Sequence, residues 1–355
     1  MRFVKHLLLC CGLGILAGPV VADCLALSTD QRLSNYCLLT RVKTISMSPK
    51  FAQLLDYRLQ QEGYRGGLGI DQTTRSDKLK RTITPVIAYT QNVNGGDPDR
   101  PYIDGGAPFQ ARVRTGGLLF GAAIDGNGRK IYGTGQYIDY AFQGSYAQAP
   151  AHAVAVKTLS AQVCTKHNVQ DYLYIDLCGN DQRVWKDLAN DRYSNLSLSG
   201  SKLTSYNALT HHALSLGARY AQYGSHSQKQ LFASLTTIYP NGRFSKLTAT
   251  FGEPVAGKLA IQHAVNASLS TLIFNRPASA IAGFTQMKGG KENILLQNLS
   301  IATLDRSDHS AMIGLAYQVS PKVSIGLRYT RTDSSLDYFD ISEPSFSLRL
   351  SSLPF

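Results

Sequence analysis

Apolar and polar residues alternate over long stretches of this chain, and the stretch YQVSPKVSIGLRY shows the pattern clearly. From Tyr317 to Tyr329, apolar residues fill the odd positions on both sides of Pro321, and polar or small residues fill the even ones. A period of two residues is that of a β-strand, whose side chains point alternately to opposite faces. The stretch therefore predicts two strands joined by a short turn, with one apolar face and one polar face.

The same alternation returns from Gly63 onward, for example in TITPVIAYTQNVN, NLSLSGSKL, LFASLTTIY and AVNASLSTLIF. Clusters rich in Gly, Pro and Asn, such as DGNGR, YPNGR and KGGKEN, separate these segments and predict turns. The count is about fourteen strands, within a range of twelve to sixteen, over residues 63–355. After the first residues of the chain, no apolar run approaches the ~20 residues of a membrane-spanning helix. An all-β fold is therefore predicted.

A soluble β-sandwich and a transmembrane β-barrel would both alternate in this way. In this chain the non-apolar face is mostly Ser, Thr, Asn, Gln and Gly, whereas the outer face of a soluble sandwich usually carries charges. Tyrosines lie at several predicted strand ends, as in the aromatic girdle of a membrane barrel, with core or interface tyrosines as the alternative. These features favour a transmembrane antiparallel β-barrel over residues 63–355.

The first 62 residues differ from the rest. Arg2 and Lys5 precede an apolar run and a stretch of small residues ending at Ala22, which is the order of a secretory signal peptide covering residues 1–22. The periplasmic segment 23–62 has room for one helix, SPKFAQLLDYRLQQEG, with Ser48 as N-cap and Pro49 at the first helical position. We expect this helix either to plug the periplasmic mouth of the barrel or to cap its first strand.

Four of the six cysteines lie beyond the predicted signal peptide: Cys24, Cys37, Cys164 and Cys178. Four cysteines in an exported chain suggest two disulfides, and the spacing favours Cys24–Cys37 and Cys164–Cys178 among the three pairings. Buried free thiols are the alternative. No pair of these cysteines has the spacing of a zinc site, and no histidine cluster accompanies them, so we predict no metal site.

Basic residues outnumber acidic residues, 36 to 24, which gives a formal net charge of +12. They are spread over the whole chain rather than clustered, so the charge does not predict a nucleic-acid partner. Basic side chains that line a pore or face anionic lipid headgroups fit this spread better. If the strand parity holds, the arginines that face the lumen are Arg112, Arg114, Arg219 and Arg328.

No arrangement of serine, histidine and acidic residues points to catalysis. His211 and Ser215 would lie on the same side of one strand but about 13 Å apart, at ~3.3 Å per residue. His309 and Ser310 are adjacent and therefore point to opposite faces. We predict that the protein is not an enzyme, with no catalytic residue and no cofactor.

The carboxyl end resembles that of outer-membrane proteins, whose final strand alternates and closes on a terminal phenylalanine. The residues that carry this resemblance are Phe346, Leu348, Leu350, Leu353 and Phe355. It implies insertion by the barrel-assembly machinery, contact with outer-membrane lipid, and a location in the cell outer membrane of a Gram-negative bacterium. The apolar series shifts from even to odd positions at Ser351-Ser352, which predicts a bulge there.

The tail YTRTDSSLDYFDISEPSFSLRL resembles the end of the barrel of surface lipoprotein assembly modifiers. Members of that family have fourteen-stranded barrels and move lipoproteins to the cell surface. They also carry an N-terminal domain of helical repeats, for which the predicted segment 23–62 leaves no room. The resemblance implies a function in translocation or transport, with a lipoprotein or another protein as client. The alternatives are a passive porin for small solutes and a structural or adhesive barrel.

Overall fold

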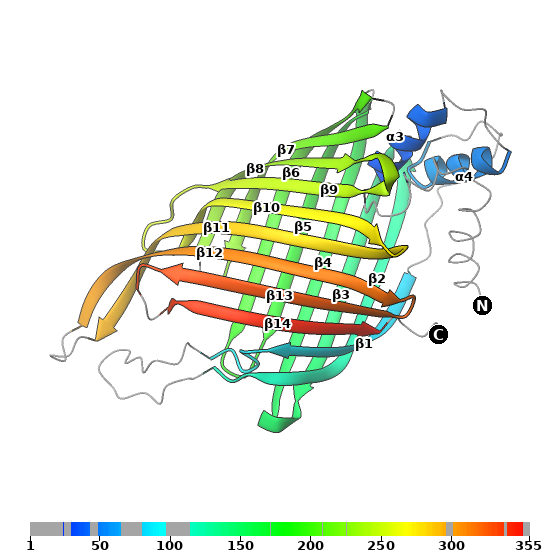
Figure 1. The fold of residues 1–355 in the computed structure, drawn as a ribbon. Helices are drawn as coiled ribbons and strands as arrows, with labels where there is room; N and C mark the ends of the chain where they lie inside the picture. The colour runs from blue at the N-terminus through cyan, green and yellow to red at the C-terminus, as the bar shows by residue number, and fades with distance from the viewer. Residues whose placement is uncertain are drawn as a thin grey trace.

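The chain folds into a single closed antiparallel barrel of fourteen strands in the computed structural model (Figure 1). Each strand pairs with its neighbours in sequence, and β1 closes the barrel against β14. The structure describes residues 24, 30–42, 49–64, 80–96, 114–170, 172–207, 209–224, 226–295, 301–336 and 339–350. The predicted fold class, an all-β antiparallel barrel of about fourteen strands, is confirmed. The predicted signal peptide lies outside the described residues.

The strands are nine to twenty residues long. Their bounds are β1 Lys80–Thr90, β2 Gly117–Gly133, β3 Gln136–Ala149, β4 Val154–Gln170, β5 Leu173–Trp185, β6 Asn190–Asn207, β7 Thr210–Tyr223, β8 His226–Ile238, β9 Phe244–Gly252, β10 Ala260–Ile273, β11 Arg276–Leu295, β12 Ile301–Ser320, β13 Val323–Ser334 and β14 Ile341–Leu350. A tilted transmembrane strand needs about 9–11 residues, so each of these strands is long enough to cross a membrane.

The outer face of the barrel is apolar. Leu315, Leu327 and Phe346 lie side by side on β12, β13 and β14, because the register pairs Leu315 with Leu327 and Leu327 with Phe346. Leu315 is 64% exposed and Leu327 is 55% exposed, and the exposed pair Leu177 and Leu198 continues this face on β5 and β6. A closed barrel with an outward apolar belt satisfies its backbone internally and presents hydrocarbon to lipid. This is the architecture of an outer-membrane protein.

The last strand contributes to the same face. Leu348 pairs with Ile325 and Leu350 pairs with Val323, so both leucines lie on the side of the sheet that carries Leu327. Of the five residues in the predicted barrel-assembly signal, Phe346, Leu348 and Leu350 therefore face outward. Leu353 and Phe355 lie outside the described residues, as does the predicted bulge at 351–352.

The two ends of the barrel differ in the length of their connections. At one end the turns that follow β2, β4, β6, β8, β10 and β12 contain two to five residues. At the other end the connection between β1 and β2 is much longer, running from Gln91 to Gly116. The helical segment and the end of β14 both lie at the short-turn end (Figure 1). Short turns face the periplasm in outer-membrane barrels, so we assign the short-turn end as periplasmic.

Among the described residues two helices precede the barrel: the predicted short N-terminal helix and a second one that was not predicted. α4 (Pro49–Gln60) begins at the proline that the sequence marks, whereas α3 (Gln31–Val42) was not predicted. The sequence of α3 does not separate an apolar face from a polar face. In the structure, polar residues of α3 such as Ser34 and Asn35 are as buried as Leu33, so the buried side of the helix is not an apolar one. No helix among the described residues is long and apolar enough to cross a membrane.

Two glycine-rich clusters that predict turns lie inside strands instead. DGNGR falls within β2, where Gly126 and Gly128 lie opposite Phe142 and Tyr140 of β3. A Cβ atom at either glycine would collide with the facing aromatic ring, so the glycines leave space for these rings to pack against the sheet. KGGKEN falls within β11, where the ladder to β12 carries a bulge.

Candidate functional site

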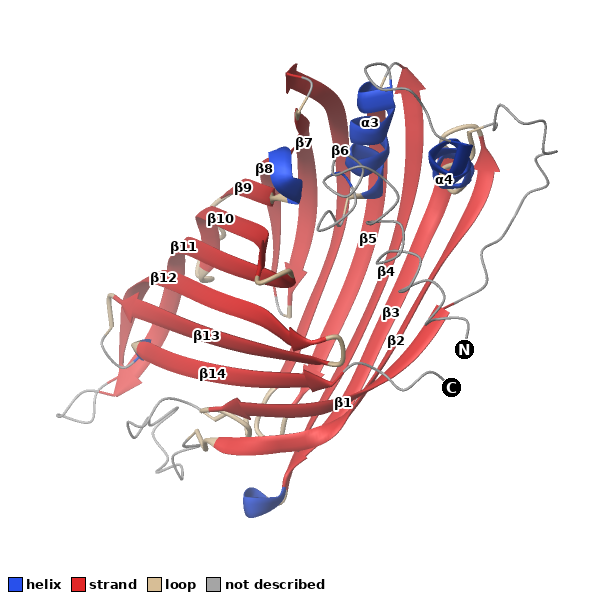
Figure 2. Cartoon of the chain, turned by 45° about the vertical axis from the view of Figure 1, so that its right-hand side comes forward, coloured by secondary structure: helices blue, strands red, loops and turns tan. Residues whose placement is uncertain are grey.

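The lumen is the candidate functional site, and α3 and α4 are fixed to one side of its wall (Figures 1 and 2). We term the described residues 30–42 and 49–64 the plug. Arg32 of α3 donates two hydrogen bonds to the Asp176 carboxylate of β5, at 2.9 Å and 2.6 Å. The same guanidinium lies 4.6 Å from the ring centroid of Tyr174. Burial by itself lowers the pKa of Arg32, but the hydrogen-bonded carboxylate raises it above its ordinary value, so the pair stays ionised.

A buried carboxyl group joins the two helices. Glu62, just after α4, accepts a hydrogen bond from Asn35 Nδ2 at 2.8 Å, and Arg58 Nε donates to Asn35 Oδ1 at 2.7 Å. Glu62 is only 1% exposed. This burial raises the pKa of Glu62 to about 7, although the positive charges of Arg129 and Arg32 act in the opposite direction. The plug therefore contains a buried group that titrates near neutral pH.

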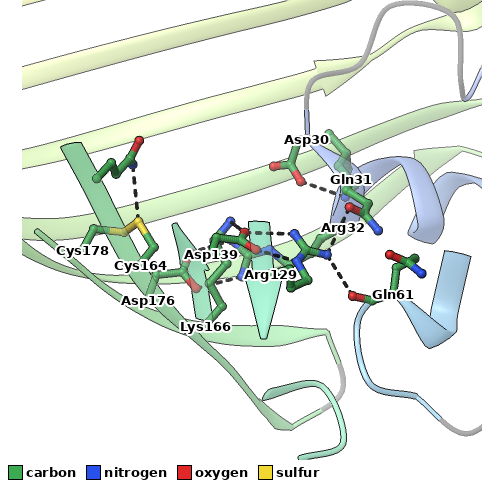
Figure 3. A network of polar contacts seen from close by, with 12 residues as sticks. Asp30, Gln31, Arg32, Gln61, Arg129, Asp139, Cys164, Lys166, Asp176 and Cys178 are labelled. Carbon is green, nitrogen blue, oxygen red and sulfur yellow. Dashed lines mark hydrogen bonds and ion pairs between the residues drawn. A yellow bond between two sulfur atoms is a disulfide. The ribbon is translucent and has the colours of Figure 1, made fainter. Parts of the chain in front are cut away.

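A second charged group ties the plug to β2, β3 and β4. Arg129 Nη2 donates to Asp139 Oδ2 at 2.9 Å, and Lys166 Nζ lies 3.2 Å from the same oxygen (Figure 3). Arg129 Nη1 also donates to the Gln31 side chain at 3.1 Å and to the Gln61 carbonyl at 3.0 Å. One guanidinium therefore bonds to the barrel wall and to the plug at the same time.

The plug also buries apolar surface against the periplasmic ends of the strands. The cluster contains Leu33, Leu38 and Leu55 of the helices, together with Tyr174, Leu203, Ala213, Ile238 and Phe244 of β5 to β9. Burial of each leucine side chain stabilises docking by roughly 1.5–3 kcal/mol before the entropy cost. The combination of ion pairs and apolar packing makes the plug an integral part of the wall.

His211 of β7 belongs to this docking surface. It is fully buried, with Nδ1 at 2.9 Å from Ser205 Oγ and 3.5 Å from Thr40 Oγ1 of α3. Ser215, considered above as its neighbour on the strand, bonds instead to Ser201 at 2.8 Å. The polar atoms around His211 thus connect the helix to the strand ends.

Both disulfides brace the region, with the pairing that the spacing favours. Cys24–Cys37 attaches the chain before the plug to α3, and Cys164–Cys178 joins β4 to β5 across the ladder. Asp176, whose carboxylate accepts the hydrogen bonds from Arg32, lies two residues from Cys178 and therefore on the same face of β5. The second disulfide fixes a strand pair that carries ionic contacts of the plug.

At the opposite end of the barrel, the connection after β1 folds onto the same side of the wall. Val93 is fully buried and packs with Ala147 and Ala149 of β3. The carbonyl of Asn94 accepts a hydrogen bond at 2.8 Å from the amide of Leu188, between β5 and β6. We term the lumen face of β2–β9, which carries the plug at one end and this connection at the other, the covered wall.

One region of the remaining lumen face is lined mostly by small side chains. A hollow of about 470 Å³ lies along β11–β14 and β1, whose lumen face we term the open wall. Its lumen-side lining includes Ala88, Ser279, Gly314, Ala316, Ser324, Gly326, Ser345 and Ser347. The plug contacts given above all go to β2–β9, and Figure 2 shows the helices on that side of the barrel. Because these side chains are small, they leave room for the hollow next to this part of the wall.

Within the part of the chain that the structure describes, the charged groups in the lining of this hollow are two arginines. Arg328 pairs in the ladder with Ser345, and Arg349 pairs with Ser324, four residues along β13. This spacing separates the two along the wall by roughly 13 Å. Both side chains are exposed, and neither forms an ion pair with another described residue. The open wall thus presents two uncompensated positive charges to the lumen.

Two of the other predicted lumen arginines, Arg219 and Arg114, lie outside the lining of this hollow. Arg219 of β7 lies over the ring of Phe232 on β8, 5.1 Å from its centroid. Arg114, just before β2, has a guanidinium nitrogen 3.9 Å from a carboxylate oxygen of Glu343. Arg112 lies outside the described residues. Of the three that the structure describes, Arg328 is the one in the lining of the hollow.

Sequence reasoning missed Arg129, Asp139, Asp176 and Arg349. Asp139, Asp176 and Arg349 each lie between two apolar residues that point outward, so the alternation carried a signal for their inward direction. Arg129 lies in DGNGR, which predicts a turn, so its direction carried no such signal. No feature of the sequence indicated which residues form ion pairs. The partner of each charged residue lies in the plug or on a neighbouring strand, and the strand register cannot be read from composition.

No known protein-family model matches the chain, and no curated protein matches its sequence. Solved structures to which it is similar include OprB of Pseudomonas putida, with a TM-score of 0.43 and 8% identity over 77% of this chain and 94% of that one. The outer membrane protein OprD of Pseudomonas aeruginosa has a TM-score of 0.40 and 6% identity, over 79% of this chain and 93% of that one. A BenF-like porin from Pseudomonas fluorescens has a TM-score of 0.38 and 8% identity, over 78% and 99%.

With TM-scores below 0.5, these likenesses carry no weight for function, which we infer from the geometry of this chain. The comparisons also give no support to the resemblance to surface lipoprotein assembly modifiers. Export of a lipoprotein or protein client, and insertion by the barrel-assembly machinery, stay predictions.

Proposed function

We propose that this protein is an outer-membrane channel through which small polar solutes diffuse passively, with a preference for anions. The observation that carries the proposal is the open wall: a hollow of about 470 Å³ lined by small residues, with Arg328 and Arg349 exposed in it. Positively charged side chains that line a pore favour the entry of anions and raise the energy of cations.

The plug supports a selective channel rather than an unobstructed one. It occupies the covered wall at the periplasmic end, where Arg32 and Asp176 form a nearly buried ion pair. A segment docked by ion pairs and apolar contacts narrows the lumen without leaving it during the passage of solute. We infer that the plug limits the size of the solute, while the open wall sets the preferred charge.

The outer surface supports a location in the outer membrane of a Gram-negative bacterium. Exposed leucines form the outward face around the barrel, as the 64% exposure of Leu315 illustrates. The short turns, the plug and the end of β14 lie at one end, in the arrangement of barrels whose short turns face the periplasm.

Liposomes that contain the refolded full chain test the proposal directly. Influx of small carboxylates, neutral sugars and amines of matched size would be followed by light scattering. We expect all small solutes to enter, with the carboxylates entering fastest and large oligosaccharides excluded. Liposomes that stay impermeable to every solute would contradict a channel.

A further inference from the structure

A second cavity lies at the junction between the plug and strands β1–β4 of the wall, and the channel proposal does not use it. This junction cavity has a volume of about 410 Å³. On the plug side it is lined by Gln31 of α3 and Gln61 after α4, and on the wall side by residues of β1–β4. Figure 3 shows Gln31, Gln61, Arg129, Asp139 and Lys166 around one network.

The junction cavity carries an excess of positive charge. Among the described residues, its charged lining consists of Lys80, Arg129 and Lys166 together with one carboxylate, Asp139. Arg129 and Lys166 share that carboxylate, at 2.9 Å and 3.2 Å. Lys80 is exposed and forms no ion pair with a described residue. Within the described lining, three cations and one anion leave an excess of two positive charges in a space partly enclosed by protein, and such an excess attracts an anion.

The rest of the lining suits a polar organic ligand. Side-chain amides come from Gln31, Gln61, Asn127 and Gln162, and each amide supplies both donors and an acceptor. The ammonium groups of lysines present three donors each and bind carboxylates as point charges. A volume of about 410 Å³ falls at the small end of sites for organic ligands, which occupy about 300–1,000 Å³.

We propose that the junction cavity binds a small dicarboxylate, with one carboxylate near Lys80 and the other near Lys166. Two uncompensated charges match the charge of a dicarboxylate, and the amides match its remaining oxygen atoms. The proposal deepens the channel function and rests on it, because solute reaches the cavity through the open lumen. It names the solute class and adds a binding step within the same barrel.

Binding at this place also affects the plug. Gln31 and Gln61 belong to the plug, whereas Lys80 and Lys166 belong to the wall, so a bound anion contacts both. A ligand that binds only the docked arrangement stabilises it in proportion to ligand concentration. A dicarboxylate therefore holds the plug against the covered wall while it occupies the cavity.

Isothermal titration calorimetry of the refolded full chain in detergent micelles tests the proposal, with succinate as the probe and inorganic phosphate as the competing anion. We expect succinate to bind the wild type more tightly than phosphate does. The Lys80→Gln/Lys166→Gln variant should bind succinate at least about tenfold more weakly, because both charged donors are lost. Lys130→Gln is the matched control, since Lys130 is exposed and follows Arg129 on the opposite face of β2.

Three results would overturn the proposal: no succinate binding to the wild type, equal binding to the double variant, or binding of phosphate as tight as that of succinate. If the double variant does not refold, the single change at exposed Lys80 replaces it, with the same expected direction. Arg328→Gln/Arg349→Gln separates this proposal from the channel proposal. That variant should keep succinate binding while losing anion preference in transport, so each proposal can fail alone.

Discussion

The covered wall and the hollow of the open wall use charge in opposite ways, whereas outside the hollow Arg306 of the open wall is paired with Glu292 and Asp308. On the covered wall, Arg32 and Arg129 are neutralised by Asp176 and Asp139 at hydrogen-bonding distance. On the open wall, Arg328 stands among serines, alanines and glycines, without an ion pair among the described residues. Paired charge in a partly buried place fixes structure, whereas unpaired charge in an open hollow remains available to a solute. We infer that one side of the lumen holds the plug and that the proposed passage of solute follows the other.

The largest expected effect comes from breaking the ion pair of the covered wall. Arg32→Met leaves the Asp176 carboxylate without its partner, and loss of one member of a buried pair costs about 3–5 kcal/mol. Guanidinium titrations of the refolded protein in micelles would measure the loss in the free energy of unfolding. Single-channel recordings should show larger or noisier openings, since the plug is docked less firmly.

Two further variants make this prediction specific. Arg32→Met combined with Asp176→Leu removes both charges and should recover most of the stability. Arg331→Met breaks the exposed pair of Arg331 and Asp333, whose side chains are 63% and 59% exposed, and should cost far less stability than Arg32→Met. Equal losses from Arg32→Met and Arg331→Met would remove the distinction between a structural ion pair and an incidental one.

The next effect contrasts the two faces of β13 in the open wall. Leu327→Arg places a charge in lipid and should cost about 2–4 kcal/mol if Leu327 lies near the bilayer midplane. Arg328→Leu changes a lumen-side residue and should leave folding nearly intact. Unfolding titrations in lipid vesicles decide between them, and similar costs for the two changes would contradict the assignment of faces.

Much of this contrast could be predicted from the sequence. The period of two residues was sufficient to identify strands, an outward apolar face and the inward direction of Arg328. Strand boundaries in β2 could not be predicted, because Gly126 and Gly128 look like turn residues until Phe142 and Tyr140 are known to cover them. These glycines are explained by the facing residues of the neighbouring strand and not by the local sequence.

The plug was harder still to predict. α4 shows a start signal at Pro49, whereas α3 has no such pattern because its polar residues are buried by specific partners. Arg32 is paired with Asp176, 144 positions away in the chain. Contacts of that kind depend on how the helix enters the barrel, which neither propensity nor spacing encodes.

A smaller effect concerns pH and the plug. The pKa of Glu62 is raised from its ordinary value of 4.5 to about 7 by burial, so the folded protein holds a proton that the unfolded chain has released. Between these two pKa values stability falls as pH rises, by up to about 3 kcal/mol in total. Unfolding titrations at pH 5 and pH 8 should show this loss for the wild type and a smaller one for Glu62→Gln. Identical pH dependence in both proteins would contradict the role of Glu62.

The smallest expected effect is steric. Ala316→Trp adds bulk to the lining of the open wall and should lower single-channel conductance by about half without changing the fold. Ala311→Trp is the matched control on the same strand, because Ala311 has the parity of outward-facing Ile313 and Leu315. If both variants conduct like the wild type, solute does not pass along the open wall.

The most direct test of the account is the reversal potential of the channel in a planar bilayer under a potassium chloride gradient. We predict steady openings selective for chloride, and loss of most of this selectivity in Arg328→Gln/Arg349→Gln, while Arg331→Gln on the outer face keeps it. A wild-type channel that selects potassium, or a double variant as anion-selective as the wild type, would contradict passage along the open wall.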